Sequence, residues 1–473
     1  MTLNDTITDG ITVADERHPS HDYSERARRH LWLQMSRMGA YDEHNEIPIM
    51  VRGKGTRVYD ANGTEYIDGL SGLFTNTLGY GRAEIAEAAA RQMNELHFFP
   101  LWTYAHPRAI ELAERIAALA PGDLNRVFFT TGGAEANESA WKLARQYHRI
   151  RGDLDRYKVI SRDVAYHGTT MGALTITSLD PYRDPFQPLV PGAVKVPATN
   201  FYRSPVHGDD PEAFGLWSAQ QIEEAILREG PETVAAVFLE PVQNAGGCFT
   251  PPPGYWRAVR EICDRYGVLL VSDEVICAFG RIGTWFGGQK YDYIPDIITA
   301  AKALTAGYAP LGAMIVSDRV AEPFQDENTA FFHGFTWSGH PVSCAVALET
   351  LRIVEEERLL DNVLANQDYF RDSLEALKEI PIVGDVRGTG YFWGVELVKD
   401  QTTKETWSGE AAERLLRGYV SKEMFRRGLI CRSDDRGDPV VQLAPPIVCT
   451  REDIDEMVGI LREVFTGAAQ LTF

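Results

Sequence analysis

Two apolar runs that end in charged residues constrain the fold more than any other part of this sequence. Residues 268–272 lead into Asp273 and Glu274, and residues 296–301 lead into Lys302. Short, nearly continuous apolar runs rich in β-branched residues are typical of strands buried on both faces of a parallel sheet. In such sheets a ligand binds outside the carboxyl ends of the strands. We therefore expect Asp273 and Lys302 to lie at the same edge.

An amine and a carboxylate at one sheet edge fit the chemistry of pyridoxal 5'-phosphate (PLP). A deprotonated lysine amine forms a Schiff base with an aldehyde, and a buried carboxylate keeps a pyridine nitrogen protonated. Taken singly, Asp273 is equally compatible with a helix cap, and Lys302 with a surface lysine. The PLP interpretation therefore depends on further residues that would complete the site.

Other predicted strand ends supply such residues. After residues 127–130, the stretch TTGGAEANE breaks a strand at Gly132 and Gly133 and opens a helix, which directs free N–H groups at an anion such as phosphate. Residues 158–163 lead to Tyr166, which could stack on a flat ring, and the strand within 234–242 ends at Glu240. No glycine fingerprint of a dinucleotide site or a P-loop follows these strands.

Composition excludes several classes of protein. A net charge of -20 over 473 residues argues against nucleic acid and anionic membrane surfaces as partners. The eleven histidines form no metal-binding motif, so no metal site is expected. The six cysteines form no CxxC pair, and no apolar signal region or membrane-spanning run occurs, so we expect a cytoplasmic enzyme.

The chain is long enough for two domains. We expect residues 1–70 to be an N-terminal segment that contributes to a small domain, with a loose tail up to about residue 22, a helix over 24–38 and a hairpin over 51–67. Residues 71–335 would form a large PLP-binding domain with a long irregular segment at 180–210, and residues 336–473 a C-terminal small α+β domain.

With these residues in view, the sequence resembles the class III (ω-amino acid) aminotransferases from about residue 24 to residue 465. The most specific part is LLVSDEVICAFGRIGTWFG followed by PDIITAAKALTAGYAPLGA, and TTGGAEANE, YHGTT, EPVQNAGG, HGFTWSGHP and CRSDDRGDPVVQLAPPIV support it. Within the class the chain looks most like amine:pyruvate and β-alanine:pyruvate transaminases. The resemblance implies a fold-type I PLP-dependent transferase of α/β class, with a mostly parallel seven-stranded sheet.

The resemblance also implies a role for each matching residue. Lys302 forms the Schiff base with PLP and then moves the proton, and Asp273 pairs with the ring nitrogen. The remaining cofactor-binding residues are expected to be Gly132, Gly133, Ala134, Tyr166, His167, Glu240, Gln243, Val275 and, from a partner subunit, Thr336. An active site shared in this way requires a homodimer, which could pair into a tetramer.

Two departures from the family pattern affect the phosphate turn and the carboxylate site. Many relatives carry serines where Gly132 and Ala134 stand, so phosphate binding relies more on backbone N–H groups here. Ornithine-type relatives carry an arginine where this chain has Thr169, which lowers the expectation of 2-oxoglutarate. The family's mobile carboxylate-binding arginine matches Arg432, with Arg436 as a rival in a longer, more acidic loop.

The sequence therefore predicts a PLP-dependent transaminase that moves the amino group of a primary amine or ω-amino acid to pyruvate, giving alanine. Its substrate pocket would be lined by Leu73, Phe74, Trp102, Tyr166, Trp337 and Arg432. Alternatives are a 2-oxoglutarate-dependent enzyme of the GABA or putrescine type, a PLP aminomutase or decarboxylating transaminase, a nicotinamide dehydrogenase, and a non-catalytic binder on the same fold. Lys302 argues against the binder, and the missing glycine fingerprint argues against the dehydrogenase.

Overall fold

The computed structural model describes residues 20–42, 44–434 and 436–473 of the chain. Most of the predicted N-terminal tail, residues 1–19, lies outside this part. A helix covers Ser20–His30 of the described residues, so it is already formed before residue 24 and ends well before residue 38. Between this helix and the first strand, the described residues contain one 3-10 helix, Met38–Ala40, and no other regular element. None of the described helices is both long and apolar enough to cross a membrane.

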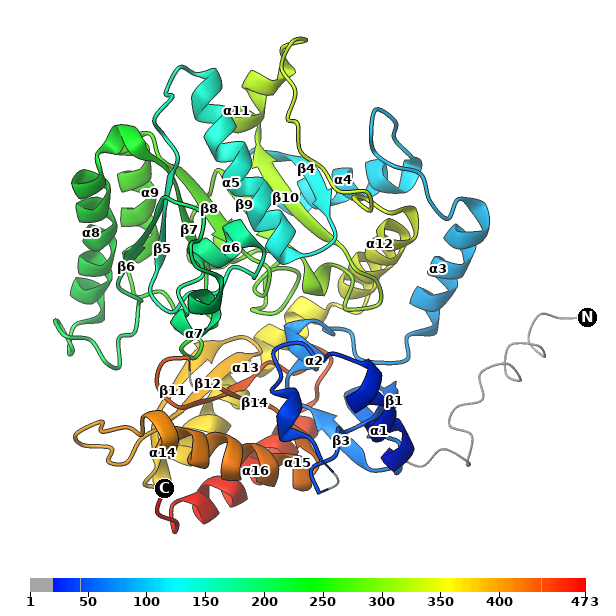
Figure 1. The fold of residues 1–473 in the computed structure, drawn as a ribbon, viewed down its shortest axis with the longest axis vertical. Helices are drawn as coiled ribbons and strands as arrows, with labels where there is room; N and C mark the ends of the chain where they lie inside the picture. Colours follow the sequence, from blue (N-terminus) through cyan, green and yellow to red (C-terminus); the bar gives the residue numbers. More distant parts are fainter. Residues whose placement is uncertain (1–19, 43, 435) are drawn as a thin grey trace, which may run out of the picture.

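A seven-stranded sheet forms the centre of the upper part of Figure 1, as the sequence predicts. The strand order is β4-β10-β9-β8-β7-β5-β6; β10 is antiparallel to both of its neighbours and the remaining neighbours are parallel. The strands are β4 (Leu124–Thr130), β5 (Lys158–Arg162), β6 (Ala193–Val196), β7 (Val234–Leu239), β8 (Leu269–Asp273), β9 (Ile297–Ala300) and β10 (Gly312–Ser317).

Helices cover both faces of this sheet (Figure 1). Their bounds are α3 (Ala83–Glu95), α4 (Pro107–Leu119), α5 (Gly133–Ile150), α6 (Met171–Ile176), α7 (Asp180–Arg183), α8 (Pro211–Glu229), α9 (Tyr255–Tyr266), α10 (Gly287–Tyr291), α11 (Asp318–Ala321) and α12 (Pro341–Glu356). The helix α5 packs Ala140 and Ala144 against buried strand residues such as Val159 and Phe238. The two central strands β7 and β8 are buried along their whole length, which explains their nearly continuous apolar sequence.

One strand of the sheet was not expected from the sequence. The segment 180–210 was predicted to be irregular, but it contains α7 and the edge strand β6, which pairs in parallel with β5. The strand β6 has only four residues, and Lys195 within it interrupts the apolar pattern. A short strand of this composition does not stand out in a Pro-rich segment.

Two four-stranded sheets lie below the large sheet in Figure 1. The first has the order β1-β2-β3-β13, and the second β11-β12-β15-β14. The strands are β1 (Met50–Lys54), β2 (Arg57–Asp60), β3 (Glu65–Asp68), β11 (Val383–Thr389), β12 (Phe392–Leu397), β13 (Leu429–Ile430), β14 (Arg432–Asp434) and β15 (Val440–Leu443). The helices of the same chain segments are α1 (Ser20–His30), α2 (Ser71–Phe74), α13 (Leu359–Glu375), α14 (Gly409–Glu413), α15 (Ser421–Arg426) and α16 (Arg451–Ala468). The predicted hairpin is β2–β3, and β3 pairs in parallel with β13 from the far end of the chain. The domain boundaries at 70 and 335 stay a prediction.

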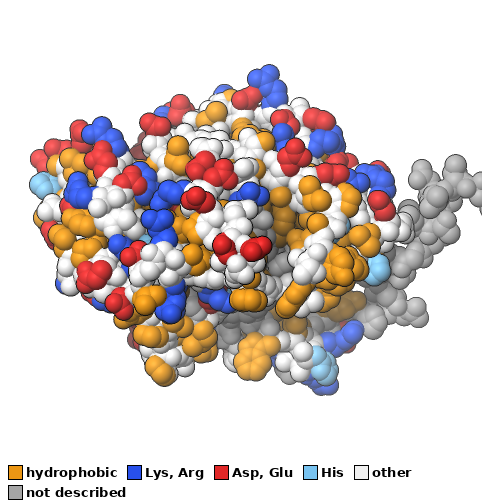
Figure 2. All heavy atoms as spheres, turned by 90° about the horizontal axis from the view of Figure 1, so that it is seen from above, with side chains coloured by type: hydrophobic (Ala, Val, Ile, Leu, Met, Phe, Trp, Pro, Cys, Tyr) orange, Lys and Arg blue, Asp and Glu red, His pale blue; other side chains and the backbone are white. Residues whose placement is uncertain are grey.

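Seen from above, the upper part of the molecule carries acidic and basic side chains interspersed with hydrophobic ones (Figure 2). On this face, side chains of the two charge signs are mixed.

Candidate active site

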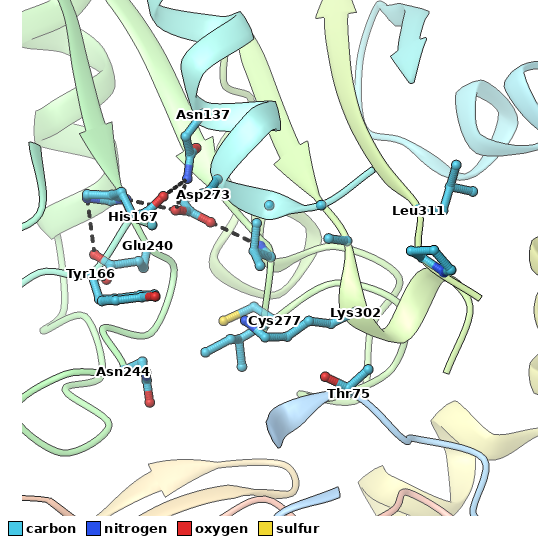
Figure 3. A pocket seen from close by; sticks show the side chains of 18 of the residues that line it. Thr75, Asn137, Tyr166, His167, Glu240, Asn244, Asp273, Cys277, Lys302 and Leu311 are labelled. Atoms are coloured by element: carbon cyan, nitrogen blue, oxygen red, sulfur yellow. Dashed lines mark hydrogen bonds and ion pairs between the residues drawn. The ribbon is translucent and has the colours of Figure 1, made fainter. Parts of the chain in front are cut away.

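Three charged residues meet where neighbouring strands end. Asp273 is the last residue of β8, Glu240 follows β7, and Lys302 lies two residues beyond β9. All three line one cavity of about 500 Å³. The predicted meeting of Asp273 and Lys302 is therefore present, and Figure 3 shows both side chains with Tyr166, His167 and Glu240 around them.

Asp273 is buried and held from three sides. Its Oδ2 accepts hydrogen bonds from Nδ2 of Asn137 at 2.8 Å and from the His167 ring, whose Nδ1 lies at 2.7 Å, and its Oδ1 accepts one from the backbone N–H of Val275 at 3.1 Å. The amide of Asn137 is oriented in turn by the Thr299 hydroxyl, which donates to its Oδ1 at 2.8 Å. None of these donors is a lysine or arginine side chain, so no such cation competes with a cationic ring nitrogen for the carboxylate.

Glu240 belongs to a second buried network on the same side of the cavity. Its Oε2 lies 3.2 Å from a guanidinium nitrogen of Arg162 and 4.0 Å from Nε2 of His167. That histidine nitrogen is buried and makes no hydrogen bond within the described residues. The His167 ring thus lies between the two carboxylates, 2.7 Å from Asp273 and 4.0 Å from Glu240 (Figure 3).

Lys302 occupies an unusual backbone position. Its φ angle is +45°, a left-handed conformation that is uncommon for a residue with a side chain and typical of functional sites. Burial lowers the pKa of its amine to about 8, although the charge of Asp273 opposes this shift. An amine with this pKa is partly neutral, and therefore nucleophilic, near neutral pH.

The phosphate cradle predicted at the start of α5 is open. Gly133 is the first residue of α5 and Gly132 precedes it, so N–H groups of the first turn lack partners within the helix. A Cβ on Gly132 would meet nothing within 4 Å, whereas a Cβ on Gly133 would come within 2.7 Å of the Val275 side chain. Gly132, Gly133 and Ala134 all line the cavity, with Tyr166, His167 and Val275.

A second cavity of about 290 Å³ adjoins the first. Tyr166, Asn244 and Lys302 line both cavities. The second cavity, called the distal cavity below, is also lined by Gln34, Met35, Leu73, Phe74, Tyr182, Arg432 and Arg436.

Four predicted site residues do not line either cavity. Gln243 is buried and donates its amide to the carbonyl of Asp163 at 2.8 Å. Thr336, Trp102 and Trp337 are exposed, and the two tryptophans have 80% and 56% of their surface accessible. Their assigned roles stay predictions.

Sequence reasoning assigned no role to Asn137, Thr299, Tyr182, Gln34 or Met35. Asn137 lies within TTGGAEANE, four residues after Gly133, so it follows the phosphate turn on the same face of the helix. Tyr182 lies in the long segment 180–210, and its length was a signal of function. No pattern in the sequence points to Gln34 or Met35, because they enter the site through the packing of an irregular segment.

The residues of the first cavity fit PLP. A buried carboxylate faces the cavity, an amine of lowered pKa lies near it, and an open glycine turn begins a long helix at one end. The described residues contain no cluster of metal-binding side chains.

The family model described as aminotransferase class-III matches residues 38–465. The chain belongs to the class III aminotransferase family. Members of this family are PLP-dependent and use an amine donor and a keto acid. This class III aminotransferase is 59% identical to a probable aminotransferase of Mycobacterium tuberculosis, with 96% of each chain covered. It is 39% identical to a putrescine–pyruvate aminotransferase of Pseudomonas aeruginosa, covering 89% of this chain and 92% of that protein.

The same relationship holds for solved structures. The ω-transaminase from Pseudomonas jessenii in complex with PMP, the aminated form of the cofactor, superposes with a TM-score of 0.87. It is 34% identical, and the match covers 94% of this chain and 97% of that one. The predicted family, fold, cofactor and transaminase activity of this aminotransferase are therefore confirmed.

Proposed function

We propose that this transaminase moves the amino group of a primary amine or ω-amino acid to pyruvate, giving alanine. The observation that supports a keto acid such as pyruvate as the acceptor is that the guanidinium of Arg432 lines the distal cavity. It approaches the carboxylate of Asp434 no closer than 4.0 Å, so it is available to a substrate carboxylate. Arg436, the rival, is already bound to Asp434 through its side chain. Of the two arginines, Arg432 is therefore the one that we assign to the substrate.

Two further observations support pyruvate. Thr169 lines the first cavity where ornithine-type enzymes carry an arginine, so no fixed cation is supplied there for a longer dicarboxylate. The name of the Pseudomonas aeruginosa relative includes pyruvate as acceptor. Met35, Leu73 and Phe74 supply apolar surface within the distal cavity, which suits an apolar amine.

When bound, PLP acts as an electron sink for the carbon that carries the amino group. Lys302 would hold the cofactor and then carry the proton between the two carbons that exchange the amine. Asp273 would keep the ring nitrogen protonated, and Tyr166 and Val275 would enclose the ring from its two faces. The N–H groups of Gly133 and Ala134 would bind the phosphate, and Glu240 would lie near the ring hydroxyl.

A homodimer with shared active sites, which could pair into a tetramer, is part of the same proposal. Phe332, Trp337 and Trp102 are large apolar side chains with 90%, 56% and 80% of their surface exposed, and Thr336 lies between the first two. A second copy that covers such side chains would remove apolar surface from water, and the family resemblance is what assigns a partner's Thr336 to the phosphate. A cytoplasmic location is also proposed, and the six free cysteines support it.

The test is the product formed from each acceptor. Purified holoenzyme is mixed with 1-phenylethylamine, β-alanine or putrescine and with either pyruvate or 2-oxoglutarate, and alanine or glutamate is measured. Alanine formation that exceeds glutamate formation at least tenfold supports the proposal. Glutamate as the main product would overturn the assignment of pyruvate and leave the transaminase activity intact.

A further inference from the structure

Two arginines and one aspartate lie together at the end of the hairpin between β14 and β15. Arg432 begins β14, Asp434 ends it opposite Val440 of β15, and Arg436 follows in the connecting loop. The side chains of Asp434 and Arg436 are 3% and 8% exposed, while that of Arg432 is 24% exposed. One buried carboxylate therefore lies within reach of two guanidinium groups.

Arg436 donates several hydrogen bonds to the carboxylate of Asp434. Its Nε lies 2.7 Å from Oδ1 and 2.9 Å from Oδ2 of Asp434, a terminal guanidinium nitrogen also donates to Oδ2, and its backbone N–H donates to Oδ1 at 3.0 Å. The guanidinium also lies over the ring of Tyr166, 5.8 Å from its centroid. A fork of this kind uses most of the acceptor capacity of a carboxylate.

Arg432 is left outside this arrangement. Its Nε lies 4.0 Å from Oδ2 of Asp434, which is beyond a hydrogen bond. Burial lowers the pKa of Arg432, and the charge of Arg436 lowers it further. Although burial works to raise it, the pKa of Asp434 lies below its ordinary value because of the charge and hydrogen bonds of Arg436. Arg432 thus carries a positive charge that a carboxylate from solution can satisfy.

We propose that Arg436 is a positioning residue, which neutralises Asp434 so that the guanidinium of Arg432 remains available to the carboxylate of the substrate. This inference rests on the proposed function, because it assumes that Arg432 binds that carboxylate. Without Arg436, the buried charge of Asp434 would have Arg432 as its nearest cation, and a small side-chain rotation would close the 4.0 Å gap. The arginine would then be held by the protein, and substrates with a carboxylate would have to displace Asp434.

The test compares substrates that do and do not carry a carboxylate. In Arg436→Gln we expect the KM for pyruvate and for L-alanine to rise about tenfold or more, the effect of losing a hydrogen bond between charged groups. The KM for 1-phenylethylamine should change by no more than about twofold, because that amine has no carboxylate for Arg432 to bind. The double variant Asp434→Asn with Arg436→Gln removes the competing carboxylate. Its KM for pyruvate should return to within about threefold of the parent value.

Further variants separate the competing explanations. Asp438→Asn, in the same loop, serves as the matched control, because Asp438 pairs with Arg203 at 2.8 Å and should leave both KM values unchanged. If the double variant is as impaired as Arg436→Gln, Arg436 either binds the substrate itself or serves the fold alone, and the inference is wrong. An unchanged KM in Arg436→Gln would also overturn it. A different result would show that the proposed function is wrong. If Arg432 does not bind the carboxylate of pyruvate, Arg432→Gln will leave the KM for pyruvate unchanged.

Discussion

Asp273 in the cofactor cavity and Asp434 beside the distal cavity are both buried, but they are held by different donors. Asp273 accepts hydrogen bonds from an amide, an imidazole and a backbone N–H, whereas Asp434 is bound by the guanidinium of Arg436. An amide and a backbone N–H orient a carboxylate and leave its charge for a ligand, while a guanidinium neutralises it. We infer that the first arrangement serves a cationic ring nitrogen and that the second keeps a neighbouring arginine available to an anion.

The largest loss of activity is expected when the amine of Lys302 is removed. Lys302→Ala should lower alanine formation by about 10⁴-fold or more, because it removes both the nucleophile and the proton carrier. The variant should still bind PLP through the phosphate turn, which fluorescence titration measures. Lys290→Met, which removes a partly buried lysine outside both cavities, is the control and should keep its activity. Retained transamination in Lys302→Ala would refute the assignment.

Removal of the charge of Asp273 tests the first half of the comparison. Asp273→Asn keeps the shape of the side chain and should lower kcat by roughly 10²- to 10³-fold, as for the loss of one preorganised electrostatic contact. The measurement is the initial rate with saturating 1-phenylethylamine and pyruvate. A kcat within about threefold of the parent enzyme would show that the charge of Asp273 is not required.

Removal of Arg432 tests the second half. Arg432→Gln should raise the KM for pyruvate by roughly 10- to 100-fold, because hydrogen bonds between charged groups contribute about 1.5–3 kcal/mol. The KM for 1-phenylethylamine should stay within about twofold of the parent value. Equal effects on both substrates would mean that Arg432 supports the fold rather than the carboxylate.

The lowered pKa of Lys302 predicts a pH dependence for reconstitution. Below pH 8 the amine is mainly protonated, and above pH 8 it is mainly neutral, since burial lowers its pKa to about 8. The rate at which the apoenzyme regains the yellow colour with PLP should therefore rise about tenfold between pH 7 and pH 9. A rate that is flat over this range would contradict the pKa assigned to Lys302.

The smallest effect is expected where a neutral donor is removed. Asn137→Ala deletes one of three hydrogen bonds to Asp273 and should lower kcat about fivefold, since such a bond contributes about 1 kcal/mol. Ser139→Ala on the same helix is the matched control and should have no effect on kcat. A loss as large as that of Asp273→Asn would show that Asn137 does more than orient the carboxylate.

The sequence predicted those parts of the site that lie directly at the end of a strand or the start of a helix, because each is marked by a short local pattern. Two apolar runs ending in Asp273 and Lys302 indicated the sheet edge, and the break at Gly132 indicated the start of α5. The edge strand β6 was missed because four residues with a lysine among them carry little signal. The helix near the N-terminus was predicted to run to residue 38, but it ends at His30.

The distal cavity was harder to predict because it is built by contacts between distant segments. Met35, Tyr182 and Arg432 come from three separate parts of the chain and meet only in the folded structure. The sequence left open which of Arg432 and Arg436 binds a carboxylate. The resemblance favoured Arg432 without excluding Arg436, and the geometry, with Arg436 on Asp434 and Arg432 at 4.0 Å, supports the same choice.

The most direct test of the proposed site is to follow the colour of the holoenzyme through the two half-reactions. The yellow protein is mixed with 1-phenylethylamine, the free amine is removed, and either pyruvate or 2-oxoglutarate is then added. We predict that the yellow absorbance bleaches with the amine and returns with pyruvate, and that this return is at least tenfold faster than with 2-oxoglutarate. Return with 2-oxoglutarate alone would contradict the assignment of Arg432, and a protein that stays colourless with PLP would contradict the site itself.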